Sequence, residues 1–380
     1  MQVCEGYSQQ GDAADAIAEA TSGWPEGSSF VPEMIFVFHS MAQDTDAVTL
    51  ELSARFPGAL IAGCTTAGEW SSGRHHNGAL VLTAIASPNI RWSIHVVESL
   101  ANFSAESARI VYDSLLGQLQ IDRSDLTPKR HFCIGLTDGI AGVDGSAVAE
   151  MGAELGNVPF LGGVAGDDLK FEKTYVIAND QAYAGGAVFI FAESEIPFRQ
   201  IKHQHFIPGE HEVVITSAIE PDRKVLKLDG MPAAERYAQL IGCKVKDLDF
   251  QMFSEHPLIY HYGNDDYVRT IFSADDDGSL SFYCTIEEGM VLNLCEHRDM
   301  TFELNKEMKN LLQDHGHVQL LFLCNCSFRS LEAEGKNLNQ GLAEITGSVA
   351  EHVVGFDTYG ELWNGLHVNQ TMVALAIGFE

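Results

Sequence analysis

Short, uninterrupted apolar runs alternate with longer amphipathic segments, and this alternation most constrains the fold. The runs MIFVFHS (34–40), ALIAG (59–63) and VQLLFLCNC (318–326) are typical of buried strands. DTDAVTLELSARF (44–56) and FELNKEMKNLLQDH (302–315) have the apolar spacing of helices that cover a sheet. The pattern predicts an α+β or mixed α/β fold, with layered mixed sheets covered by helices in two halves.

The middle of the chain is richer in strand signals. Four segments are expected to be consecutive antiparallel strands: TYVIAND (174–180), AYAGGAVFIFA (182–192), RQIKHQHFI (199–207) and HEVVITSAI (211–219). Residues 267–286 predict a hairpin around the turn Asp275–Gly278. The composition changes at Glu220-Pro221-Asp222, which predicts one domain over residues 1–222 and a second over 223–380.

The charge balance excludes some partners. The 380 residues include 53 acidic and 23 basic side chains, for a formal net charge of −30. Such a surface repels phosphate backbones and anionic lipid heads, so neither nucleic acid nor membrane insertion is expected. The first residues, MQVCEGYSQQ, lack the basic and apolar regions of a signal peptide, and the eight cysteines have no framework spacing. These features predict a cytoplasmic protein with reduced thiols.

Two loops rich in small residues follow apolar strands. In GCTTAGE (63–69), Cys64 has the position of a nucleophile, while a structural turn or a pocket-lining loop explains the same pattern. In LGGVAGDD (161–168), the glycines permit close backbone approach, but the lysine of a phosphate loop is missing. Asp167 and Asp168 have the chemistry to bind a cation or to cap the turn.

Histidines concentrate in QIKHQHFIPGEH (200–211). On a single strand, His203 and His205 would share an apolar face with Ile201 and Ile207. That spacing suits two zinc ligands, or one axial haem ligand with an apolar surround, or an exposed edge strand. His211 lies at the end of the same stretch.

Three other features carry potential chemistry. HPLIYHY (256–262) brings His256 and His261 close to tyrosines, as ligands or as packed core aromatics. Cys324 and Cys326 end a very apolar strand, without a second cysteine pair at zinc spacing. Arg269 and Arg329 could clamp a carboxylate or pair with one of the many acids. No catalytic or phosphate-binding motif is present, so a binding protein rather than an enzyme is expected.

Taken in order along the chain, these strings resemble a known family. GCTTAGE, LGGVAGDDLKFEKTYV and KVLKLDGMPAAERY are similar to the N-terminal FIST domain leading into its C-terminal partner. HPL, YVRTIF, CNCSFR and GFDTYGEL are similar to the C-terminal FIST domain. The resemblance implies a sensory protein that binds a small ligand and acts on a signalling partner.

Within the family, the histidine-rich chain resembles bacterial sensors of nitric oxide that hold haem b and regulate a histidine kinase in trans, in biofilm and cyclic di-GMP signalling. Where family members tend to have a Gly-Trp-x-Pro string, this chain reads QHFIP, which selects His205 as axial ligand of the haem iron. The other candidates are His203, His211, His256 and His261. The resemblance leaves a homodimer open.

Two other functions stay open. The first is a sensor of an organic ligand such as an amino acid, without haem. Its pocket residues would be Cys64, Thr65, Gly163, Asp167 and Arg269. The second is a zinc or thiol switch that uses His203, His205 and a cysteine.

Overall fold

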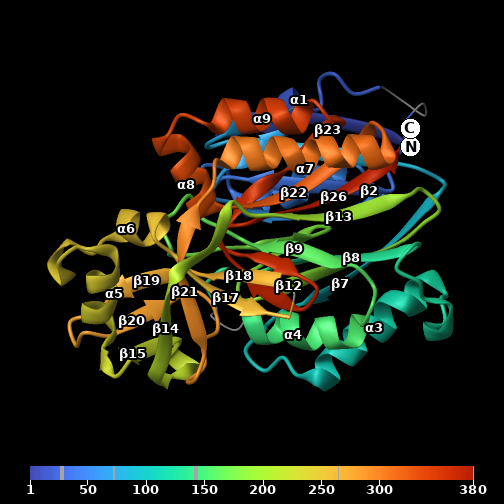
Figure 1. Cartoon of the computed structure of the whole chain (residues 1–380). Helices are drawn as coiled ribbons and strands as arrows, with labels where there is room; N and C mark the ends of the chain where they lie inside the picture. The colour runs from blue at the N-terminus through green and yellow to red at the C-terminus, as the bar shows by residue number, and fades with distance from the viewer. Residues whose placement is uncertain (26–29, 72, 141–143, 264, 380) are drawn as a thin grey trace.

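The structure is a computed structural model that describes residues 1–25, 30–71, 73–140, 144–263 and 265–379. These residues form three six-stranded sheets and one eight-stranded sheet (Figure 1). Helices pack on the outside of the sheets, which confirms the predicted mixed fold of sheets and covering helices. Within the described residues, every helix is too short or too polar to cross a membrane.

The three six-stranded sheets share one strand order. In the first, the order is β1 (Gln2–Ser8), β6 (Leu80–Ala86), β2 (Met34–His39), β3 (Leu60–Thr65), β10 (Val176–Ala178) and β11 (Gln181–Tyr183). In the second, it is β7 (Ile90–Val97), β12 (Ala187–Ser194), β8 (His131–Thr137), β9 (Phe160–Val164), β24 (Glu361–Trp363) and β25 (Leu366–Val368). In the third, it is β13 (Phe198–His203), β26 (Met372–Phe379), β22 (Val318–Cys326), β23 (Ala350–Thr358), β4 (Glu69–Ser71) and β5 (Arg74–His76).

Strand direction repeats in the same way. The pairs β2/β3, β8/β9 and β22/β23 are parallel, and the other neighbours in these three sheets are antiparallel. In each repeat, the hairpin that follows the second parallel strand in sequence pairs with a neighbouring sheet instead of its own. β4–β5 follow β3 but pair with β23, β10–β11 follow β9 but pair with β3, and β24–β25 follow β23 but pair with β9. The body is therefore a threefold internal repeat whose hairpins are exchanged in a ring.

One apolar core lies among the three sheets. Phe36 of β2 has its ring centroid 5.2 Å from Phe322 of β22 and 6.1 Å from Trp92 of β7. Helices cover the outer face of each sheet. They are α1 (Ala13–Ala20) and α2 (Thr45–Arg55) on the first, α3 (Ala105–Leu119) and α4 (Asp144–Leu155) on the second, and α7 (Met300–His315), α8 (Ser327–Gly335) and α9 (Asn339–Gly347) on the third. The parallel strands are consequently buried on both faces, as their continuous apolar sequences predict.

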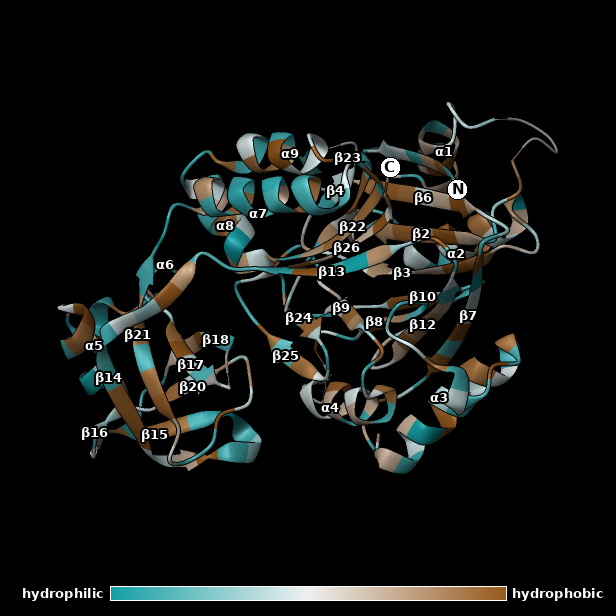
Figure 2. Ribbon diagram, turned by 45° about the vertical axis from the view of Figure 1, so that its right-hand side comes forward, coloured by the Kyte–Doolittle hydropathy of each residue, from teal (hydrophilic) through white to brown (hydrophobic). Residues whose placement is uncertain are grey.

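Residues 206–297, here called the inserted lobe, interrupt the third repeat between β13 and α7. Figure 2 shows the lobe standing apart from the three-sheet body. Its sheet comprises β14 (Phe206–Ile219), β15 (Lys224–Leu228), β16 (Met231–Pro232), β17 (Leu258–Tyr262), β18 (Asp265–Arg269), β19 (Ile271–Ala274), β20 (Leu280–Phe282) and β21 (Val291–His297). The helices α5 (Ala233–Ile241) and α6 (Phe250–Glu255) complete it. The lobe has its own core around Tyr237 and Phe253.

Element types were predicted better than pairings. The strand β22, the helices α2 and α7 and the β19–β20 hairpin are confirmed. The expectation that residues 174–219 form consecutive antiparallel strands is wrong, because β12 pairs with β7 and β8 while β13 pairs with β26. The predicted strand 199–207 is also wrong as a single strand: β13 ends at His203 and β14 begins at Phe206.

Candidate functional site

His203 and His205 lie at the break between β13 and β14, so they do not share one strand face. Both are buried, with 4% and 1% of their surface exposed. Neither ring nitrogen of His203 has a hydrogen-bond partner among the described residues. Burial lowers the pKa of His203 well below its usual value, and the neighbouring Arg329 and His205 lower it further. His203 is therefore a neutral imidazole.

His205 is held by two charged neighbours from α8. Its Nε2 lies 2.9 Å from Oε2 of Glu332, and its Nδ1 lies 3.1 Å from Nη1 of Arg329. Because the guanidinium only donates, Nδ1 accepts and Nε2–H donates to Glu332. Burial lowers the pKa of His205 to about 4, against the hydrogen bond to Glu332 and with a smaller lowering effect from Arg329. This imidazole is neutral with both nitrogens engaged, so binding iron requires it to give up one of these contacts.

The same place contains a possible metal-ligand group. The ligand atoms of His205, His297 and Glu332 all lie within 4.8 Å of one another. The group differs from the predicted zinc set, because it contains neither His203 nor a cysteine. Nη1 of Arg329 is 3.1 Å from His205, and Nζ of Lys336 is 2.6 Å from Oε1 of Glu332. Two cations this close oppose a third, so the donor set fits a divalent metal poorly.

The remaining predicted haem ligands do not converge on a cavity. His211 and His261 are exposed, and Nδ1 of His261 lies 2.8 Å from Oδ1 of Asp266. The ring of His256 is 6.3 Å from that of His297. Two cavities are described below, and neither is lined by a predicted haem ligand. The histidine that lines the first is His75, and the one that lines the second is His367.

A polar cleft lies where parallel strands of all three sheets end. Ser40 directly follows β2, Ala67 lies two residues after β3, Asp168 follows β9, and Ser327 begins α8 directly after β22. The cleft encloses about 490 Å³ and is called the strand-end cleft here. Its full lining is Ser40, Ala42, Ala67, His75, Asn77, Gly78, Asp168, Leu169, Ser327, Ser330, Leu331 and Glu334. Ligands of open α/β sheets generally bind at the carboxyl ends of the strands.

The exchanged β4–β5 hairpin supplies the central imidazole of the cleft. His75 Nε2 lies 2.6 Å from Oδ2 of the buried Asp357, which follows from the pairing of β4 with β23. Trp70 Nε1 and Asn325 Nδ2 donate to the other oxygen of Asp357, at 2.9 and 2.8 Å. Burial works against a charged His75, but the Asp357 carboxylate outweighs it and raises the pKa of His75 above its usual value. The surroundings of His75 at the wall of the cleft thus favour its positively charged form.

The first turn of α8 faces the cleft through two hydroxyl groups. Ser330 Oγ lies 3.2 Å from His75 Nε2, while the buried Ser327 Oγ has no hydrogen-bond partner among the described residues. A helix N-terminus favours anions, because its N–H groups and dipole point outward. Asp168 and Glu334 line the same cleft and supply negative charge, with Ser40 Oγ donating to Asp168 Oδ2 at 3.1 Å. The cleft therefore offers sites for both ends of a small zwitterion.

Of the five residues predicted to line a ligand pocket, four lie behind the strand-end cleft and one lines another cavity. Cys64 is buried in β3, and burial raises the pKa of its thiol well above the usual value, so it is a core residue. Thr65 accepts a hydrogen bond from the backbone N–H of Tyr175, and a β-carbon on Gly163 would lie 2.8 Å from the ring of Phe356. Asp167 accepts from the backbone N–H groups of three residues, Phe171, Glu172 and Lys173. None of these four residues lines the cleft: three lie in the strands that lead to it, and Asp167 holds the loop after β9. Arg269 lines a different cavity.

His75 and Ser330 are the residues that sequence reasoning missed. The string RHHNG (74–78) reads as an exposed turn, and its partner Asp357 is 282 residues away. CNCSFR was interpreted as a strand end, whereas it continues into α8. A usable signal was the similarity of GEW (68–70) and GELW (360–363), which begin the equivalent hairpins.

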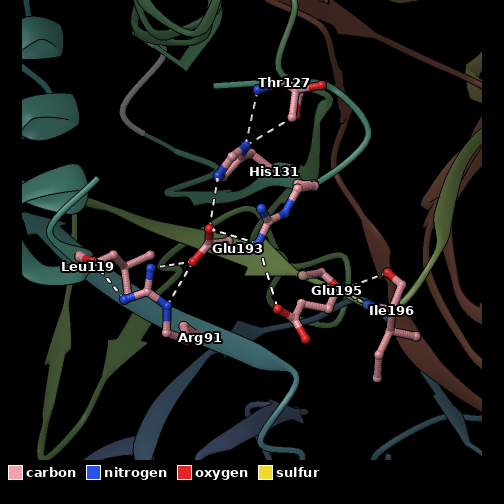
Figure 3. A network of polar contacts seen from close by, with 9 residues as sticks. Arg91, Leu119, Thr127, His131, Glu193, Glu195 and Ile196 are labelled. Carbon is pink, nitrogen blue, oxygen red and sulfur yellow. Dashed lines mark hydrogen bonds and ion pairs between the residues drawn. The ribbon is translucent and has the colours of Figure 1, made fainter. Parts of the chain in front are cut away.

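A second polar network, shown in Figure 3, is structural. Arg91, Glu193 and His131 are neighbours across β7, β12 and β8. Arg91 Nε donates to Glu193 Oε2 at 2.7 Å, and Arg91 Nη1 donates to the carbonyl of Leu119 at 2.7 Å. Arg91 is half exposed, and such surface pairs contribute at most about 1 kcal/mol. The network ties strand ends together and lines neither cavity.

Comparisons with known proteins match most of the chain to one family. The FIST N domain matches residues 33–231, and the FIST C domain matches residues 233–364. The uncharacterized protein MJ1623 of Methanocaldococcus jannaschii is 25% identical over 201 residues, which cover 48% of this chain and 37% of that protein. A crystal structure of a chorismatase covers 99% of this chain and 98% of its own at 12% identity, with a TM-score of 0.35, too low to support any conclusion.

Proposed function

Since this chain belongs to the FIST family, whose domains are sensors in signal transduction, we propose that it detects a small zwitterion, such as an amino acid. The ligand binds in the strand-end cleft, and the signal passes to a partner in trans, for which a histidine kinase is proposed. One observation carries the proposal: both glycine-containing loops and the start of α8 line a single polar cleft. The protein acts by binding, without catalytic chemistry.

Each end of the ligand has a complementary group. The carboxylate accepts hydrogen bonds from the first turn of α8, from the unpartnered Ser327 hydroxyl and from Nδ1–H of His75, whose Nε2 is paired with Asp357 and whose pKa is raised. The ammonium group donates to Asp168 and Glu334. Asp168 belongs to the loop after β9, and Glu334 belongs to α8. A bound ligand would therefore connect the first half of the chain to α8.

Calorimetric titration of the twenty amino acids tests the proposal. At least one should bind, and Asp168→Asn should weaken it at least tenfold, because a charged hydrogen bond contributes about 1.5–3 kcal/mol. Asn tolerates the left-handed backbone of residue 168, which has φ 55°, so the substitution preserves the loop. Asp180→Asn, at an exposed position outside the cleft, is the matched control. Equal binding by the two variants would place the ligand elsewhere.

A haem-based nitric oxide sensor is the second candidate, and the sequence resemblance at QHFIP supports it. His205 would ligate the iron after leaving Arg329 or Glu332, and the ligand change on nitric oxide binding would alter the affinity for the kinase. An absorption spectrum after haem reconstitution tests this candidate. A Soret band in the wild type that His205→Ala removes supports it, and the absence of a band eliminates it.

A further inference from the structure

We propose a second ligand site, for an organic carboxylate with an aromatic or branched apolar body. It lies in a cavity of about 480 Å³ between α4, the β24–β25 hairpin and the inserted lobe, called the aromatic cavity here. Ligand-binding cavities generally have volumes of about 300–1,000 Å³ and a mainly apolar lining with a few polar groups. The proposal is independent of what binds in the strand-end cleft.

The apolar wall has an aromatic character. The lobe contributes Tyr260, Tyr267 and Met290, and the hairpin contributes Leu366. Tyr260 and Tyr267 are directly opposite each other on β17 and β18, so their side chains lie next to each other on one face of the sheet. A flat or branched apolar group packs well on such a surface.

Arg269 is the charged group aimed at this cavity. It is 9% exposed, and its Nε has no hydrogen-bond partner among the described residues. Its Nη1 is 3.4 Å from the carbonyl of Val268, and its Cζ lies 5.6 Å from the centre of the Tyr260 ring. A buried guanidinium with an unpaired donor is costly, and a carboxylate is the acceptor that matches its fork geometry.

A second arginine lies at the edge of the cavity. Nη2 of Arg223 is 3.9 Å from the position that a β-carbon on Gly145 would take, and Gly145 lines the cavity. Glu287 is the acidic residue of the lining. In a chain with a formal charge of −30, one arginine in the lining and a second beside it favour an anion over a cation.

The internal repeat explains why a cavity exists here. The exchanged β4–β5 hairpin packs on α9 beside the strand-end cleft, and the exchanged β24–β25 hairpin packs on α4 beside the aromatic cavity. A β-carbon on Gly68 would lie 2.9 Å from Nε2 of His75, and one on Gly360 would lie 1.8 Å from Nε2 of His367. The two cavities are thus repeat-related, but the inserted lobe closes the second with tyrosines and arginine, which predicts a different ligand.

Binding of benzoate and phenylacetate to the whole chain, measured by calorimetry, tests the proposal. Benzamide and inorganic phosphate are the probes that lack, respectively, the charge and the ring. We expect at least one aromatic carboxylate to bind, with at least tenfold weaker binding of benzamide and of phosphate. Arg269→Gln should weaken the aromatic carboxylate at least tenfold, whereas Arg91→Gln should leave it unchanged.

Ala149→Leu gives a second variant that does not touch the buried arginine. Ala149 is an exposed residue of α4 that lines the cavity, so a larger side chain fills the space without disturbing the core. It should abolish binding at an unchanged melting temperature. Failure of both aromatic carboxylates to bind the wild type would overturn the proposal, as would unchanged binding by Ala149→Leu. Phosphate binding as tight as benzoate would refute the ligand class.

Discussion

Two histidine–carboxylate pairs in this molecule have opposite electrostatics. His75 with Asp357, and His205 with Glu332, each place an imidazole within 2.9 Å of a buried carboxylate oxygen. The pKa of His75 is raised despite burial, because Asp357 favours the charged form. The pKa of His205 is lowered to about 4 by burial, which its contact with Glu332 does not offset and to which Arg329 adds. Both imidazoles are buried beside a carboxylate, so the further neighbours separate them: Glu69 and Glu334 also raise the pKa of His75, whereas Arg329 lowers that of His205.

The difference assigns different roles to the two pairs. His75 lines the strand-end cleft, where a charged imidazole can meet a ligand carboxylate. His205 is 1% exposed and lines neither described cavity, so its contacts connect the β13–β14 junction to α8. We therefore propose that the first pair serves ligand binding and that the second supports the structure. The following predictions test this comparison.

The largest expected effect is on stability when Arg329 is removed. Arg329→Ala leaves a cavity beside the unpaired Nδ1 of His205, so urea unfolding should show a loss of about 3–5 kcal/mol. Arg329→Met, which retains most of the volume, should lose less. An unchanged unfolding midpoint in Arg329→Ala would show that the second pair does not support the structure.

Acid should destabilise the protein through His205. Its pKa is about 4 in the folded state, below the usual 6.5, so the folded state binds fewer protons than the unfolded state between these values. The stabilisation is present above pH 6.5 and is lost as pH falls towards 4, by up to about 3 kcal/mol. Unfolding free energies of the wild type and His205→Gln, measured from pH 7.5 to 4, check this. Parallel pH curves would contradict it.

His75 should show the opposite pH dependence and a smaller effect on stability. Its folded pKa is raised, so its contribution is complete below pH 6.5 and disappears as pH rises through the folded pKa. His75→Gln should lower stability by about 1 kcal/mol, because Trp70 and Asn325 still donate to Asp357. The same variant should weaken ligand binding in the strand-end cleft about tenfold, and denaturation paired with titration measures both. A large stability loss without a change in affinity would reverse the assigned roles.

The smallest effect is expected at the surface network of Figure 3. Arg91→Gln removes a half-exposed partner of Glu193 and should cost less than about 1 kcal/mol, an effect that 0.5 M salt reduces. It should leave binding in both cavities unchanged. If Arg91→Gln lowered the free energy of unfolding as much as Arg329→Ala, exposed and buried charge contacts would contribute equally to stability, which would contradict the comparison.

Sequence periodicity predicted local elements and failed where distant partners decide the structure. β22 and α7 follow from continuous apolar residues and helical spacing, which are local properties. The pairing of β4 with β23 joins Trp70 to Gly355, and no local pattern carries that information. A single strand through His205 was expected, but the chain leaves the third sheet after His203 and enters the inserted lobe at Phe206. The site depends on these long-range pairings, so only its two loops were visible in the sequence.

Calorimetric titration of amino acids against the wild type, His75→Gln and His205→Gln tests the central claim most directly. The account predicts that an amino acid binds the wild type, that His75→Gln binds it about tenfold more weakly, and that His205→Gln binds it with unchanged affinity. Loss of binding in His205→Gln with full retention in His75→Gln would contradict the account and place the ligand at the β13–β14 junction.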